Sequence, residues 1–102
     1  MNTVRDEFPA LWQFLGGYLH QDWRHEYPSP EAAFRDFLDG EPGLAVETAA
    51  ELTAVLASGR DEDALKSFVL EGGSFYVPSN DGIAPSAWLA RLLSMCPRAT
   101  DE

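Results

Sequence analysis

The sequence predicts an all-α fold in one compact domain of about five helices. Apolar residues recur at intervals of three and four in five segments, which is the spacing of one face of a helix. Serine, aspartate or proline stands at the start of several of these segments and glycine at the end, as is typical of helix boundaries. The 102 residues, of which 45% are hydrophobic, suffice for a core of their own.

The first predicted helix runs from about Pro9 to Asp22. A proline is tolerated in the first turn, where its missing amide would have no partner. The predicted inner face comprises Phe8, Leu11, Trp12, Leu15 and Leu19. Each glycine of Gly16-Gly17 costs a helix about 1 kcal/mol relative to alanine. Either the helix bends there or another helix approaches closely, and we favour the close approach.

The second predicted helix begins at Ser29-Pro30, where the serine is suited to cap the first turn. It ends at Asp39-Gly40, with Gly40 expected in the left-handed conformation. Its inner face is Ala33, Phe34, Phe37 and Leu38. A third helix is predicted from about Leu44 to Ser58, ending before Gly59. Its inner face is Ala45, Ala49, Leu52 and Leu56.

A fourth predicted helix is capped by Asp61 and ends at Gly72-Gly73. Its inner face is Leu65, Phe68 and Val69. Residues 74–78 are expected to form an extended connector rather than a sheet, because one short segment has no clear partner strand. Asn80-Asp81-Gly82 is a turn signal.

The last predicted helix begins near Pro85 and ends before Pro97, which cannot continue a helix without a kink. Its buried face is Trp88, Leu89, Leu92 and Leu93. The whole chain, 1–102, is expected to form a single domain with flexible ends at 1–7 and 98–102. Replacing Trp12 or Trp88 by alanine should cost about 3–5 kcal/mol if both rings are buried.

The net charge limits the classes of partner. Seventeen acidic and seven basic residues give a formal charge of −10, so phosphate backbones and anionic membranes would repel the chain. The N-terminus lacks a secretory signal, and no apolar run approaches the roughly 20 residues of a membrane span. The single cysteine, Cys96, cannot form an internal disulfide. We therefore expect a cytoplasmic protein that binds neither nucleic acid nor membranes.

No motif for catalysis or cofactor binding stands out. His20, Asp22 and His25 include common metal ligands, but the histidines are five positions apart and would diverge on a helix. Neither a nucleophile elbow nor a phosphate-binding loop occurs. We therefore predict no enzyme, no metal and no cofactor.

Three segments resemble those of a known family. They are the aromatic stripe 8–15, the cluster Tyr18-Leu19-His20-Gln21-Asp22-Trp23, and Trp88-Leu89. Together they are similar to the contact-dependent growth inhibition immunity proteins of bacteria, the CdiI type, from about Phe8 to Leu93. The resemblance implies a small antidote that binds and blocks a cognate toxin domain. It also implies that a motif defining the family can be structural, because the toxin-facing surface usually varies.

Two groups of residues are candidates for partner binding. Trp23 and Tyr27 could be flat aromatic anchors beside Asp22 and Glu26; the alternative is a wholly structural motif. The second group is an outward acidic set, where like charges would be relieved by a basic partner. It comprises Glu31, Asp36, Asp39, Glu41, Glu47 and Glu51. A solvated acidic surface would explain this set equally well.

The sequence thus predicts an immunity protein that binds a basic toxin domain, possible examples being nucleases, in a one-to-one complex without turnover. An acidic helical adaptor in an unrelated assembly is the alternative from another class. A small hydrolase acting through His20 and Asp22 is a third reading. Exposed aromatics would also suit a homodimer, so the oligomeric state stays open.

Overall fold

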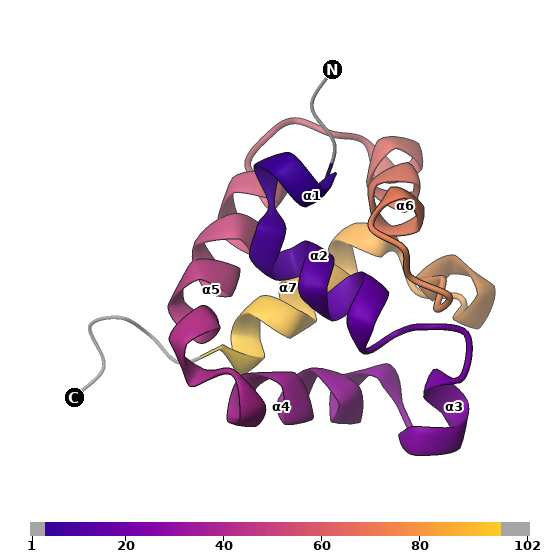
Figure 1. Ribbon diagram of the computed structural model, residues 1–102. Helices are drawn as coiled ribbons and strands as arrows, with labels where there is room; N and C mark the ends of the chain where they lie inside the picture. Colours follow the sequence, from indigo (N-terminus) through magenta and orange to yellow (C-terminus); the bar gives the residue numbers. More distant parts are fainter. Residues whose placement is uncertain (1–3, 97–102) are drawn as a thin grey trace.

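Helix α5 lies against both α2 and α7, and the other helices surround these three (Figure 1). The computed structural model describes residues 4–96. Its elements are α1 (Val4–Glu7), α2 (Pro9–Gly17), α3 (Trp23–Glu26), α4 (Pro30–Gly40), α5 (Pro42–Leu56), α6 (Glu62–Glu71), the 3₁₀ helix η1 (Pro78–Asp81) and α7 (Pro85–Met95). In Figure 1, α4 runs along the bottom of the molecule and α6 stands at the upper right.

The predicted fold class is confirmed. Five helices of nine residues or more occur within residues 4–96, and that part of the chain contains no β-strand. Residues 74–77 form the expected extended connector, and Pro78 begins η1. None of the helices between residues 4 and 96 has both the length and the apolar character needed to cross a membrane.

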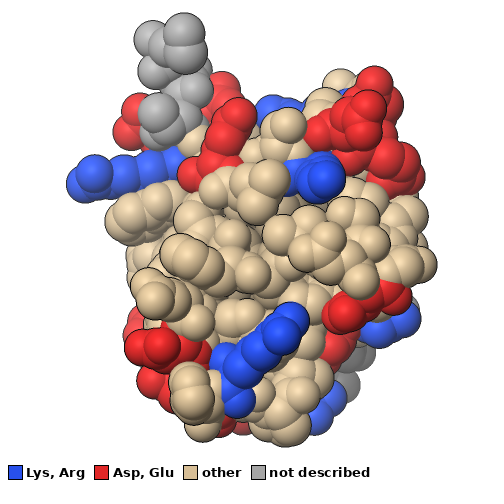
Figure 2. All heavy atoms as spheres, turned by 90° about the vertical axis from the view of Figure 1, so that its right-hand side faces the viewer, with Lys and Arg blue, Asp and Glu red and all other residues tan. Residues whose placement is uncertain are grey.

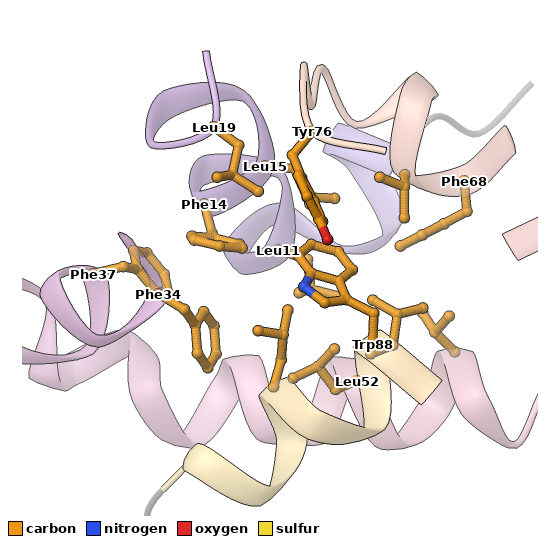
Figure 3. Close-up of a cluster of buried hydrophobic side chains, with 14 of the residues drawn as sticks. Leu11, Phe14, Leu15, Leu19, Phe34, Phe37, Leu52, Phe68, Tyr76 and Trp88 are labelled. Atoms are coloured by element: carbon orange, nitrogen blue, oxygen red, sulfur yellow. The ribbon is translucent and has the colours of Figure 1, made fainter. Parts of the chain in front are cut away.

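The core is built on aromatic side chains from α2, α4 and α7 (Figure 3). The ring of Phe14 packs edge-on against Phe34 with 4.8 Å between centroids and lies 5.6 Å from Phe37. Trp88 is completely buried and lies 5.2 Å from the ring of Tyr76. The predicted burial of Trp88 is therefore confirmed. Five of the other residues predicted for inner faces are only partly buried: Phe8, Leu38, Ala49, Leu56 and Leu93.

The predicted burial of Trp12 is wrong. Its side chain is 37% exposed, and the guanidinium of Arg5 lies 5.2 Å from the ring centroid. The inward position is taken by Phe14, which is fully buried together with Leu11 and Leu15. These three positions share one face of a helix, and Trp12 lies outside that face.

The first long helix ends at Gly17 rather than at Asp22. Beyond it the N–H of Leu19 donates to the carbonyl of Phe14, and the carbonyl of Leu19 accepts the N–H of Phe75 at 2.7 Å. The chain therefore leaves the helix to contact the connector. The expected close approach at the glycine pair is confirmed for Gly16, where an added Cβ would lie 3.1 Å from the carbonyl oxygen of Gly72. The approaching segment is the turn after α6, however, and not another helix as predicted.

Two predicted side-chain caps are confirmed and one predicted glycine cap is wrong. Ser29 Oγ accepts the N–H of Ala32, and Asp61 Oδ1 accepts the N–H of Ala64. Gly40 stays within α4 and does not have a positive φ. The interruption comes instead at Glu41, whose backbone is not helical (φ −130°, ψ 62°), since the proline that follows disfavours the helical conformation there. Positive φ angles occur at the predicted helix ends Gly59 and Gly73.

Residues 4–7 belong to the N-terminal segment that was expected to be flexible. These form α1, and Val4 is only 6% exposed within the core. Residues 1–3 and 98–102 lie outside the described part of the chain.

Candidate functional site

Trp23 is a core residue rather than an exposed anchor. Its side chain is 5% exposed and packs edge-on against Tyr76 with 5.6 Å between ring centroids. The guanidinium of Arg24 lies 5.1 Å from the same ring. The expectation that Trp23 offers a flat exposed surface is wrong, because the connector places Tyr76 against it.

Tyr27 is half-buried and joins the end of α3 to α4. Its hydroxyl donates to Asp36 Oδ2 at 2.5 Å, and its ring stacks on Tyr18 with 6.4 Å between centroids. The hydrogen bond to Asp36 is the main reason that the pKa of Tyr27 is raised to about 12. Tyr27 and Asp36, which were expected in separate groups, are thus brought together.

His20, Asp22 and Glu26 close the turn between α2 and α3. The N–H of Asp22 donates to His20 Nδ1 at 3.1 Å, and His20 Nε2 lies 3.4 Å from Glu26 Oε1. Both acidic residues are exposed. The interaction of His20 with Asp22 is through the backbone rather than through the carboxylate.

Two of the expected acidic residues make long-range contacts within the molecule. Glu31 on α4 forms an ion pair with Arg91 on α7 at 3.2 Å. Glu51 on α5 accepts the N–H groups of Leu11 and Ala10 at 2.8 and 3.2 Å. Burial raises the pKa of Glu51, and the two backbone hydrogen bonds oppose this rise. The expectation that Glu51 projects outward with Glu47 is wrong, since Glu51 turns toward α2.

Three of the expected acidic residues remain exposed around the junction of α4 and α5: Asp39, Glu41 and Glu47. Within residues 4–96 none of their carboxylates has an ion pair or a side-chain hydrogen bond. These three residues are called the junction carboxylates below. They are the members of the predicted acidic set that stay available to a partner.

Sequence analysis missed a groove beside α2. It has a volume of about 510 Å³ and is lined by Trp12, Gln13, Gly16, Gly17, Tyr18, Glu41, Gly72 and Gly73. Of the ten candidate residues, only Glu41 lines it. The two glycine pairs were visible in the sequence, but nothing in their spacing indicated that they meet.

An uncharged surface adjoins this groove. Phe75, which follows the glycine turn after α6, is 62% exposed, and Leu70 on α6 is 46% exposed. Figure 2 shows the side of the molecule that carries α6 and the connector. Uncharged residues form a broad band across its middle, and charged residues gather above and below. Apolar exposure of this kind is typical of interaction surfaces.

Groups that could support catalysis or hold a metal are sparse in the described residues. Between residues 4 and 96, no three His, Cys, Asp or Glu side chains are arranged to hold a metal ion. Burial raises the pKa of the Cys96 thiol to about 11. A thiol with such a pKa is protonated near neutral pH and is a poor nucleophile.

Comparison with known proteins gives one match. A family model described as CdiI immunity protein matches residues 7–95. No curated protein and no solved structure matches this chain. The matched range includes all five long helices and the groove, and it covers most of the 102 residues. The chain therefore belongs to the CdiI immunity protein family.

Proposed function

We propose that this protein neutralises a cognate toxin domain by tight one-to-one binding that covers the active site of the toxin, without turnover. The observation that carries the proposal is the family match over residues 7–95. Binding alone suffices for such a function, because occlusion requires no catalytic group. We place this activity in the cytoplasm.

The negative charge of the protein supports the proposal that the toxin binds through a basic surface. The chain has a formal charge of −10, and the junction carboxylates have no cationic partner within residues 4–96. Complementary charge accelerates association and discriminates against wrong partners. Nucleases bind their substrates through basic surfaces. We therefore propose a nuclease toxin, whose nucleic-acid substrate the acidic inhibitor would mimic in charge.

Co-expression with the toxin domain encoded immediately upstream tests this function. The expected results are rescue of growth, co-purification of the two chains, and a complex mass equal to one copy of each. A matched control is the toxin domain of a different immunity system, which should not be neutralised. Failure of a folded wild-type protein both to rescue and to co-purify would overturn the proposal in favour of an acidic adaptor.

A further inference from the structure

We propose that the groove beside α2 receives an arginine side chain from a loop of the toxin, an inference that rests on the proposed function. The lining of the groove combines two aromatic side chains, one carboxylate and four glycines. Its aromatic residues are Trp12 and Tyr18, and its carboxylate is Glu41. None of the residues that line it is basic.

The lining suits a planar cation. A guanidinium stacks on aromatic faces and pairs with carboxylates, and it is more weakly hydrated than an ammonium group. The protein already shows this preference, since the guanidinium of Arg5 lies 5.2 Å from the Trp12 ring. Glu41 supplies the opposite charge and has no ion pair within the described residues.

The charges of two carboxylates act on the Tyr18 side chain at the groove. The pKa of Tyr18 is raised, first by burial of the ring and then by the charges of Asp36 and Glu41. The hydroxyl of Tyr18 also lies close to α4, since a Cβ added at Gly40 would be 3.6 Å from it. A cation that enters the groove would therefore approach two carboxylates from neighbouring parts of the chain. This charge complementarity favours a basic loop over an apolar one.

Packing does not explain why residue 17 is a glycine. Gly16 needs to be small because of Gly72, but a Cβ added at Gly17 would meet nothing within 4 Å. Gly17 also lacks a positive φ, so its backbone conformation is open to other residues. Glycine lowers helix stability relative to alanine. Its presence here leaves space in the groove, because a side chain at this lining position would occupy it.

A tethered guanidinium can test the site. Gly17→Arg places an arginine side chain at the groove, where it would compete with that of the toxin. Ala57→Arg is the matched control, because Ala57 is exposed at the end of α5 that lies away from the junction carboxylates, lacks a positive φ and does not line the groove. Both variants change the net charge by the same amount, so any general loss of electrostatic attraction is equal.

The second pair of variants removes one negative charge. Glu41→Gln alters the groove, whereas Asp63→Asn makes the same charge change on α6 at an exposed position outside it. Trp12→Ala removes one of the two aromatic side chains of the lining from a partly exposed position. Circular dichroism and thermal unfolding would establish that each variant is folded.

The measurement is the dissociation constant for the purified, catalytically inactivated toxin domain encoded immediately upstream, together with growth rescue. We expect Gly17→Arg and Trp12→Ala to weaken binding by a factor of about 30 or more, as at an interface hot spot. Glu41→Gln should weaken it about tenfold, and the two controls should change it less than about threefold. Wild-type affinity for Gly17→Arg, or an equal loss for Ala57→Arg, would overturn the groove proposal while the proposed function stands. If wild-type protein itself fails to bind or rescue, both proposals fall.

Discussion

Glu51 on α5 accepts the backbone N–H of Leu11 on α2 at 2.8 Å, although the two residues are 40 positions apart. The second carboxylate oxygen accepts the N–H of Ala10. The residue at the N-cap of α2 is Phe8, whose side chain makes no capping hydrogen bond. Unpaired N–H groups at a helix start are costly when buried. A side chain from another helix therefore does what local capping residues usually do.

Removing this long-range cap should destabilise the protein. We expect Glu51→Ala to lower the free energy of unfolding by about 1–2 kcal/mol, the usual range for losing a cap. Glu51→Gln should cost less, because its amide oxygen can still accept one hydrogen bond. Urea unfolding followed by circular dichroism measures both. Equal stability of wild type and Glu51→Ala would show that water satisfies these N–H groups without cost.

The stability contributed by Glu51 should fall as the pH rises. Its folded-state pKa is raised above 4.5, so the folded protein binds this proton more tightly than the unfolded chain. The contribution is then complete below the unfolded pKa and declines as the pH passes through the folded pKa. The stability of wild type relative to Glu51→Gln should therefore decrease from about pH 4 to pH 7. A relative stability that increases over this range would contradict the raised pKa.

The two tryptophans on helices α2 and α7 should respond differently to truncation. Trp88→Ala removes a fully buried side chain and should cost about 3–5 kcal/mol. Trp12→Ala removes a partly exposed ring and should cost about 1 kcal/mol or less. Denaturant midpoints measured at constant slope compare the variants. Similar losses for both would contradict the different burial of the two rings.

Replacing the two adjacent glycines at the end of α2 by alanine should have different effects on stability. Gly16→Ala brings a Cβ to 3.1 Å from a backbone oxygen of Gly72, and we expect destabilisation by about 1–3 kcal/mol. Gly17→Ala meets nothing within 4 Å and should leave stability unchanged or raise it by up to about 1 kcal/mol. Thermal unfolding of the two single variants tests this. The reverse order would mean that the close approach lies at Gly17.

Toxin binding should depend on salt through its association rate. Screening shortens the range of the field from about 30 Å at 0.01 M salt to about 8 Å at 0.15 M. We expect the association rate constant to fall at least tenfold over this range, while the dissociation rate changes less. Surface plasmon resonance at several salt concentrations separates the two rates. Salt-independent association would argue against charge mimicry.

The helices were predicted well because the residues that begin and end a helix lie next to it in the sequence. Ser29 and Asp61 cap the helices that follow them, and Gly59 and Gly73 take positive φ at helix ends. Gly40 does not form the predicted cap, because Pro42 restricts the backbone conformation of Glu41 and α4 ends there. The absence of a strand within residues 4–96 also agrees with the prediction from the sequence.

The inner face of α2 was less predictable. Trp12 and Phe14 are both large and apolar, so periodicity alone did not decide which one points inward. Phe14 packs against both Phe34 and Phe37 in the core, and Trp12 is left at the surface. The helices that pack against α2 therefore determine which of the two aromatic side chains is buried.

By itself, the sequence determined the fold class, the long helices and the family, because these depend on short-range patterns and characteristic motifs. Only the tertiary structure decided which carboxylates stay exposed and which make contacts within the molecule. It turned Glu51 into a helix cap, paired Glu31 with Arg91, and brought Gly16 against Gly72 beside an open groove. Each of these contacts joins residues far apart in the chain, so their geometry is set by packing rather than by local spacing.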